Sequence, residues 1–248
     1  MSRIPTPQNI EIAALKQKAV MRFDPMAPGP GTPWEDRASH GVVGAFFKTV
    51  GMSLFAPAKL ASAVRRPETT SDTSSFLIAC CVCWSLSAFI HGMIFEHQLA
   101  KDPRVTIDNY TIDTVIAAVA AGVGVWLLFR LYNMIYAKLV AQEKNQSPLP
   151  PALLYNINAY ALGPSIVALI PFVGPPLALL WILVALVAVG IGRLRLRFAA
   201  ALIDSLIPFV AVLVIGYVAY WVGDLVLNQP LPSYELAQPT ATGGAPGQ

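Results

Sequence analysis

The sequence predicts an all-α fold: a polytopic membrane bundle of five transmembrane helices, preceded by amphipathic or interfacial helices. Composition is the first reason, because the 248 residues are 55% hydrophobic and only 12% charged. Soluble domains carry about 25% charged residues. The second reason is that the chain contains five apolar stretches, each close to the roughly 17–25 residues that cross a bilayer. Both observations place the chain among integral membrane proteins.

The five expected spans are separated by polar or proline-rich connections. They cover about residues Phe76–Phe95, Thr114–Tyr132, Leu153–Phe172, Pro176–Ile191 and Ala199–Trp221. The connection between the third and fourth spans is so short that it predicts a helical hairpin. The fourth span is at the short end of the range needed to cross a bilayer.

Proline and glycine interrupt the third span and its turn at Gly163, Pro164, Pro171 and Gly174. A proline removes a backbone donor and frees a carbonyl, and no water satisfies these groups inside hydrocarbon. Neighbouring helices are therefore expected to pack around the breaks and satisfy the backbone. These four residues and Tyr160 are the candidate structural residues inside the membrane.

The charges of the connections predict the orientation of the bundle. The segment before the first span holds nine Lys and Arg residues, and the connection between the fourth and fifth spans is purely basic. The connection after the first span instead carries three aspartates against Lys101 and Arg104. Since basic connections stay in the cytoplasm, we expect a cytoplasmic N-terminus and an extracytoplasmic C-terminus.

Three regions are predicted along the chain. Residues 1–41 form a cytosolic front segment, residues 42–230 the membrane domain, and residues 231–248 a disordered tail. Within the front segment, helical spacing predicts a short amphipathic helix after Asn9, and Pro25–Pro33 reads as a flexible linker.

Two short helices are expected to lead into the first span. They cover about residues 43–54 and 57–66, and both are too short to cross the membrane. The linker before them is followed by Trp34, Glu35, Asp36 and Arg37. An aromatic residue beside three charged ones makes this the candidate partner-binding segment.

Few residues of the spans could carry chemistry. Asp204 is the only carboxylate well inside an expected span, and ionisable groups at membrane depth suggest function. Two interpretations stay open for it: a structural ion pair or helix contact, and a proton or ion site.

His91 and His97 are interpreted as polar residues at the interface, and Cys80, Cys81 and Cys83 as packing residues. We expect no catalytic residues, no cofactor, no metal and no nucleic-acid partner.

Several short motifs, in this order along the chain, resemble the Yip family of five-span membrane proteins named for binding Ypt/Rab GTPases, and especially its prokaryotic members. The motifs are Pro33–Arg37, Phe46–Thr49, Leu54–Pro57, Tyr160–Pro164, Ile170–Gly174, Trp181, Val189–Gly192 and Ala199–Ala201. The resemblance covers about Trp34 to Leu227. It implies partner recruitment, because eukaryotic Yip proteins recruit prenylated Rab GTPases in vesicle trafficking and associate with one another. The Rab function does not carry over to a prokaryotic member, and the family brings no catalytic residues.

The leading hypothesis is a non-enzymatic scaffold or partner-recruiting protein in membrane organisation or trafficking. Its partners would be the lipid bilayer and other membrane proteins, or further copies of itself. A small transporter or channel-like protein that uses the broken helices is one alternative. An accessory subunit of a larger membrane complex is another.

Overall fold

The computed structural model describes residues 26–65, 69–99, 101, 110–144 and 149–227. These residues form helices without any strand. The helices are α2 (Arg37–His40), α3 (Val42–Phe55), α4 (Pro57–Ala63), α5 (Ser71–Leu99), α6 (Tyr110–Lys144), α7 (Pro151–Tyr160), the 3-10 helix η1 (Gly163–Leu169), α8 (Gly174–Leu194) and α9 (Phe198–Leu227). The helix predicted after Asn9 and the tail predicted at residues 231–248 lie outside the described residues.

Five helical segments are long and apolar enough to cross a membrane, which confirms the all-α five-span fold class. They are Ser71–Gln98, Ile112–Ala141, Pro151–Leu169, Gly174–Leu194 and Phe198–Ala219. Each contains most of the corresponding predicted span. The main difference is length, because α5 and α6 extend through polar residues beyond the apolar runs on which the prediction rested.

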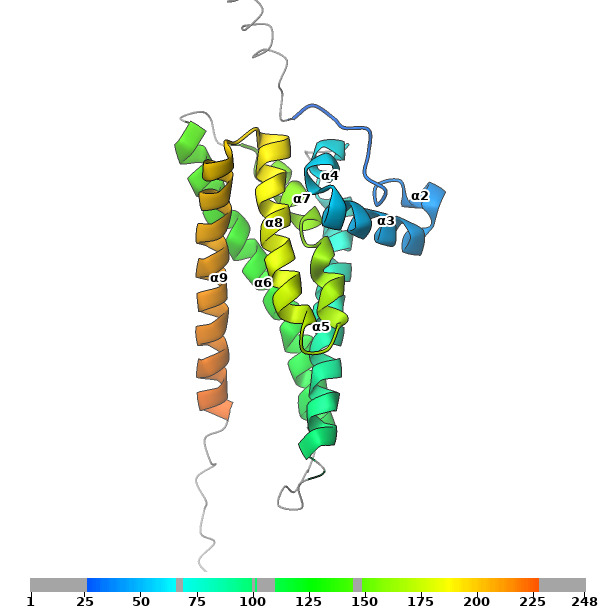
Figure 1. Ribbon diagram of the computed structural model, residues 1–248, viewed down its shortest axis with the longest axis vertical. Helices are drawn as coiled ribbons and strands as arrows, with labels where there is room; N and C mark the ends of the chain where they lie inside the picture. Colours follow the sequence, from blue (N-terminus) through cyan, green and yellow to red (C-terminus); the bar gives the residue numbers. More distant parts are fainter. Residues whose placement is uncertain (1–25, 66–68, 100, 102–109, 145–148, 228–248) are drawn as a thin grey trace, which may run out of the picture.

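The spans form one bundle, in which α5 and α6 are a long antiparallel pair and α8 lies between η1 and α9 (Figure 1). Glycines allow the close contacts. A Cβ on Gly192 of α8 would lie 2.7 Å from the Cβ of Ala58 in α4. The described chain begins at one end of the bundle, and α9 ends at the other (Figure 1).

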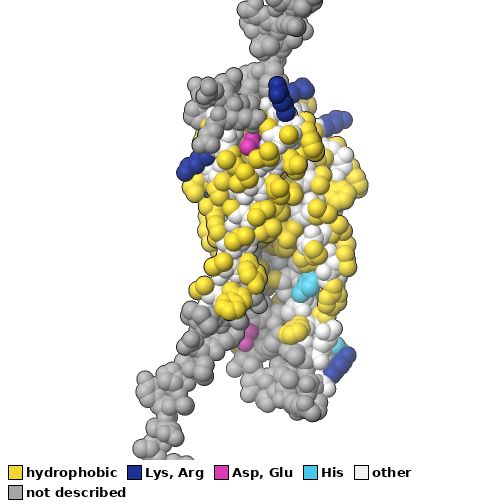
Figure 2. All heavy atoms as spheres, turned by 60° about the vertical axis from the view of Figure 1, so that its left-hand side comes forward, with side chains coloured by type: hydrophobic (Ala, Val, Ile, Leu, Met, Phe, Trp, Pro, Cys, Tyr) yellow, Lys and Arg dark blue, Asp and Glu magenta, His cyan; other side chains and the backbone are white. Residues whose placement is uncertain are grey.

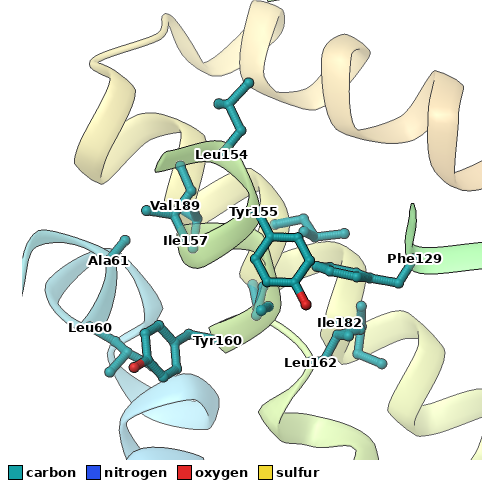
Figure 3. Close-up of a cluster of buried hydrophobic side chains, with 14 of the residues drawn as sticks. Leu60, Ala61, Phe129, Leu154, Tyr155, Ile157, Tyr160, Leu162, Ile182 and Val189 are labelled. Carbon is teal, nitrogen blue, oxygen red and sulfur yellow. The ribbon is translucent and has the colours of Figure 1, made fainter. Parts of the chain in front are cut away.

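The third span, α7 followed by η1, is the centre of the bundle. In its most apolar stretch 78% of the residues are buried, against 22–28% for the first, second and fifth spans. Its side chains meet neighbours on several sides (Figure 3): Tyr155 packs edge-on against Phe129 of α6, with ring centroids 5.3 Å apart, and Tyr160 lies beside Leu60 of α4. The other spans use one face for this core and turn the remainder outward.

The outward faces of the spans are apolar. Figure 2 shows a broad hydrophobic region on one side of the molecule, with lysine and arginine side chains toward its two ends. Exposed valine, isoleucine and leucine side chains of α6, α8 and α9 contribute to this surface. Such a surface would be unstable in water and suits hydrocarbon, so the chain is an integral membrane protein.

The two short helices predicted before the first span are α3 and α4. Figure 1 shows α3 lying across the direction of the spans at one end of the bundle. Its inner face buries Ala45, Thr49, Val50 and Ser53. α4 begins with Pro57 in its first turn, where a proline is favourable, and it ends at Ala63, three residues before the predicted end.

Candidate functional site

The break in the third span lies at Ala161 and Leu162, just before Gly163 and Pro164. The hydroxyl of Ser53 in α3 donates a 2.7 Å hydrogen bond to the carbonyl of Tyr160, the last residue of α7. The amides of Ala161 and Leu162 donate to carbonyls three residues back, at 3.1 Å each. The freed backbone is satisfied by an adjacent helix and by 3-10 bonds, as the sequence predicted.

Helix α5 supports the second half of the broken span. The hydroxyl of Ser87 donates to the carbonyl of Ala168 at 2.6 Å, and the indole of Trp84 donates to the hydroxyl of Ser165 at 3.0 Å. Ser165 is fully buried. The polar groups beside the break therefore bind one another across helices, which is a packing arrangement.

The turn between the third and fourth spans is held by His91 of α5. The backbone amide of Phe172 donates to Nε2 of His91 at 3.0 Å, while Nδ1 lies 2.6 Å from the carbonyl of Ser87. These contacts assign the tautomer with the proton on Nδ1. Pro171 precedes Phe172, whose φ is 64°, and a Cβ on Gly174 would collide with the carbonyl of Val167. The turn thus requires glycine at position 174.

The candidate partner-binding segment is seated on the bundle by Trp34. The indole is only 5% exposed and donates to the carbonyl of Asp72 at 2.7 Å. Its ring packs edge-on against Phe46 and Phe76, with centroids 6.2 and 5.6 Å away. Arg37 adds an ion pair with Asp72 at 2.7 Å. The segment therefore has an intramolecular role, and partner binding by the same residues stays a prediction.

The two carboxylates of this segment also face the bundle. Glu35 accepts hydrogen bonds from the amide of Thr32 at 2.7 Å and from the amide of Arg65 at 3.1 Å. Asp36 forms an ion pair with the side chain of Arg65 at 3.0 Å. A pocket of about 230 Å³ lies beside them and is lined by Glu35, Arg37, Ala38, Arg65 and Asp72.

The stretch predicted as a flexible linker is also docked where the structure describes it. The amides of Gly29 and Gly31 donate to the carbonyls of Val64 and Ala63, at 2.8 Å each. Thr32 is fully buried, and its hydroxyl donates to the hydroxyl of Tyr160 at 3.1 Å. Residues 29–32 therefore lie against the end of α4 and are named the strap.

Asp204 lies in α9 and is buried. It is near Tyr132 of α6, which stacks on Tyr136 with ring centroids 5.5 Å apart. The tyrosines, Asp204 and the buried Ser205 form a polar cluster between α6 and α9 near one end of the bundle. Both interpretations of Asp204 given above remain compatible with this position.

Polar side chains near the start of α7 form a second buried cluster. Asn156 accepts from the hydroxyl of Thr73 at 2.7 Å and donates to the carbonyl of Thr69 at 2.8 Å. Asn158 donates to the side-chain oxygen of Asn133 in α6 at 2.9 Å. Buried amides fix helix register when they are paired in this way. The cluster connects α7 to both α5 and α6.

Arg130 of α6 is a feature that the sequence prediction did not single out. Its guanidinium lies 5.2 Å from the ring centroid of Trp126 and 5.1 Å from that of Tyr155. It lines a pocket of about 460 Å³ between α6 and α7. A tryptophan four residues before an arginine, at the end of an apolar run, was the available signal.

The cysteines and histidines make no metal site within the described residues, where no group of three or more His, Cys, Asp or Glu side chains converges. Cys80 and Cys83 are buried and Cys81 is half-buried, and all three are free thiols. They pack within α5, as the sequence indicated.

Comparisons with known proteins place the chain in no family: no protein-family model, no curated protein and no solved structure matches it. The resemblance to the Yip family therefore stays a prediction, and the functional argument depends on the structure of this chain.

Proposed function

We propose that this integral membrane protein is a non-enzymatic recruiter of partner proteins, of the Yip type, and that the front segment, together with the adjoining start of α3, is its contact surface. The observation that carries the proposal is the contrast between the two sides of that segment. Its inner side is fixed to α5 by Trp34 and Arg37. Its outer side is a continuous exposed run at residues 38–43.

This run, together with Phe47 of α3, is named the α2–α3 corner. Val42, Val43 and Phe47 are all more than half exposed, and the exposed His40 and Lys48 lie beside them in the sequence. An anchored surface with exposed apolar side chains loses little conformational entropy when a partner binds. Aromatic residues at such positions often dominate binding energy, which makes Phe47 the residue to test.

Crosslinking and affinity capture from native membranes test the proposal, with partners identified by mass spectrometry. Three variants are compared with the wild type: deletion of residues 1–25, Phe47→Ser, and Phe55→Ser as the matched control. Phe55 is an exposed phenylalanine on the same helix, 84% accessible against 56% for Phe47. The deletion ends before Trp34, so the anchoring contacts remain.

The expected result is one stoichiometric partner that the wild type and Phe55→Ser capture and that Phe47→Ser loses. Loss on deletion of residues 1–25 would extend the contact surface to that stretch. Equal capture by Phe47→Ser and Phe55→Ser, together with equal capture after the deletion, would contradict the proposal. Membrane insertion and thermal stability are measured for every variant.

The transporter alternative has one favourable observation, the buried carboxylate of Asp204. The broken third span supports it less, because Ser165 is bound to Trp84 and the freed carbonyls to serines of α3 and α5. Solute flux in proteoliposomes that Asp204→Asn abolishes, with the fold intact, would favour transport over recruitment.

A further inference from the structure

Two hollows lie one after the other along the same side of α6. The first, named the Arg130 pocket, has a volume of about 460 Å³ and is lined by Arg130, Asn133, Thr70 and Tyr155 together with apolar side chains of α6 and α7. The second, named the α5–α6 groove, has about 300 Å³ and is lined by Ile78 and Val82 of α5 and by Val119, Val123 and Trp126 of α6.

We infer that the Arg130 pocket and the α5–α6 groove together bind one phospholipid with an anionic headgroup, its phosphate at Arg130 and an acyl chain in the groove. The inference concerns a different surface from the α2–α3 corner and does not depend on partner recruitment.

The charge of Arg130 is available for an anion. Its guanidinium is held between the rings of Trp126 and Tyr155, and cation–π contacts orient an arginine without neutralising it. Among the described residues, the ion pairs join Arg37 to Asp72 and Arg65 to Asp36, and neither involves Arg130. The planar guanidinium matches two phosphate oxygens at once.

Arg130 also lies at the right depth for a headgroup. Gly92 of α5 faces Thr114 of α6, and Gly122 faces Ser85. This antiparallel register places Arg130 beside the first turns of α5. The hydroxyl of Tyr155, whose ring contacts Arg130, lies 3.2 Å from that of Ser74. The pocket is therefore beside the start of the first span, Ser71–Gln98, at one of the two ends of that span, and headgroups lie at the ends of spans.

The α5–α6 groove starts where the pocket ends, because Trp126 lines the groove and also contacts Arg130. From there it follows the apolar part of both spans toward the middle of the bilayer. Its width comes from Gly122, whose missing side chain leaves Ser85 and the backbone of Cys81 as the floor. The cationic Arg130 pocket and the apolar α5–α6 groove together match the polarity of one phospholipid molecule, with its charged headgroup and its apolar acyl chains.

The headgroup, not the acyl chain, should determine the selectivity. Lipid chains elsewhere in the bilayer are as apolar as those in the groove, so moving a chain into the groove gains little free energy. The phosphate of either kind of lipid can contact Arg130, but the ammonium group of a zwitterionic headgroup would lie near the guanidinium and repel it. We therefore expect an anionic lipid to be preferred over a neutral one with identical chains.

Native mass spectrometry of the purified full-length chain tests this, with dioleoyl phosphatidylglycerol and dioleoyl phosphatidylcholine as the probes. The wild type should retain phosphatidylglycerol preferentially, and Arg130→Gln should reduce that preference by about tenfold, the effect of losing one charge-assisted contact. Lys138→Gln is the matched control, because it removes an equal charge from an exposed position on the same helix outside the pocket.

A second variant keeps Arg130 and fills the pocket instead. Ala152 of α7 lines the pocket, so Ala152→Phe should reduce phosphatidylglycerol retention while leaving the basic charge unchanged. Thermal unfolding without added lipid shows whether Arg130→Gln folds. If it does not, Ala152→Phe alone tests the inference. A phosphatidylglycerol with a photoreactive acyl chain should label peptides containing Ile78–Val82 or Val119–Val123.

Unchanged lipid preference in both Arg130→Gln and Ala152→Phe would overturn the inference. Equal losses in Arg130→Gln and Lys138→Gln would also overturn it, because they would indicate general surface attraction. Labelling confined to α8 and α9 would contradict the proposed position of the acyl chain.

Discussion

Ser53 of α3 donates its hydroxyl proton to the backbone carbonyl of Tyr160, with an oxygen–oxygen distance of 2.7 Å, at the residue where α7 ends. An interfacial helix thus completes the backbone of a membrane span. Thr32, in the strap before α2, donates to the hydroxyl of the same tyrosine at 3.1 Å. Tyr160 therefore takes part both in the break of the third span and in the docking of the front segment.

Ser53→Ala should destabilise the protein by about 1–3 kcal/mol, because it leaves a buried carbonyl without its donor. Thermal or denaturant unfolding in detergent measures the change. Ser62→Ala is the matched control, since the Ser62 hydroxyl donates at 3.0 Å to a carbonyl of its own helix and is exposed. Equal effects of the two substitutions would show that the Ser53 bond does not support the break.

Gly163→Ala should also be destabilising, for a steric reason. A Cβ at position 163 would lie 2.6 Å from the Cβ of Ser53 and 3.4 Å from the Cα of Val50. Overpacking of this kind costs about 1–3 kcal/mol. Since the nearest atom is a Cβ, Ser53→Ala should not relieve the clash. Ser53→Gly removes that atom and should recover part of the stability lost in Gly163→Ala. Unfolding of the single and double variants measures this coupling.

Trp34→Ala should release residues 26–41 from the bundle while the spans stay inserted. The substitution removes the indole that packs on Phe46 and Phe76 and donates to Asp72. Limited proteolysis should then cut within residues 26–41 much faster than in the wild type.

Two variants with smaller expected effects on proteolysis are compared with Trp34→Ala. Trp34→Phe keeps most of the ring packing and should have an intermediate effect. Arg37→Gln breaks an ion pair whose side chains are 36% and 23% exposed, and partly exposed pairs contribute at most about 1 kcal/mol. Proteolysis that Trp34→Ala leaves unchanged would contradict the anchoring role of Trp34.

The spans could be predicted from the sequence because hydrocarbon imposes one rule on all of them: a long apolar run that satisfies its own backbone. The break at Gly163 and Pro164 was also predictable, since proline removes a donor wherever it stands. The partners that satisfy the break were not, because Ser53 and Ser87 are distant in sequence and serine has many roles in helices. Trp34 shows the same limit, since its burial depends on Phe46 and Phe76.

Arg130 shows why the pocket was missed. At the end of a span, an arginine ordinarily reads as an interfacial anchor, and the sequence around it is consistent with that. Its second aromatic neighbour, Tyr155, comes from α7, where the tyrosine also contacts Ser74 of α5 and Phe129 of α6. Arg130 lines a pocket because α7 packs against α5 and α6, and this packing could not be predicted from the sequence around Arg130.

The contact between His91 and Phe172 gives a last prediction, about the turn between the third and fourth spans. His91→Phe should remove the acceptor of the Phe172 amide and leave a ring in the same place. The bond from the Gly174 amide to the Ile170 carbonyl still holds the turn, so global stability should fall by only about 1 kcal/mol, the net contribution of one hydrogen bond. Hydrogen exchange at the Phe172 amide should nevertheless become markedly faster. His97→Phe, an exposed histidine on the same helix, is the control, and exchange that is equally fast in both variants would mean that His91 does not hold the turn.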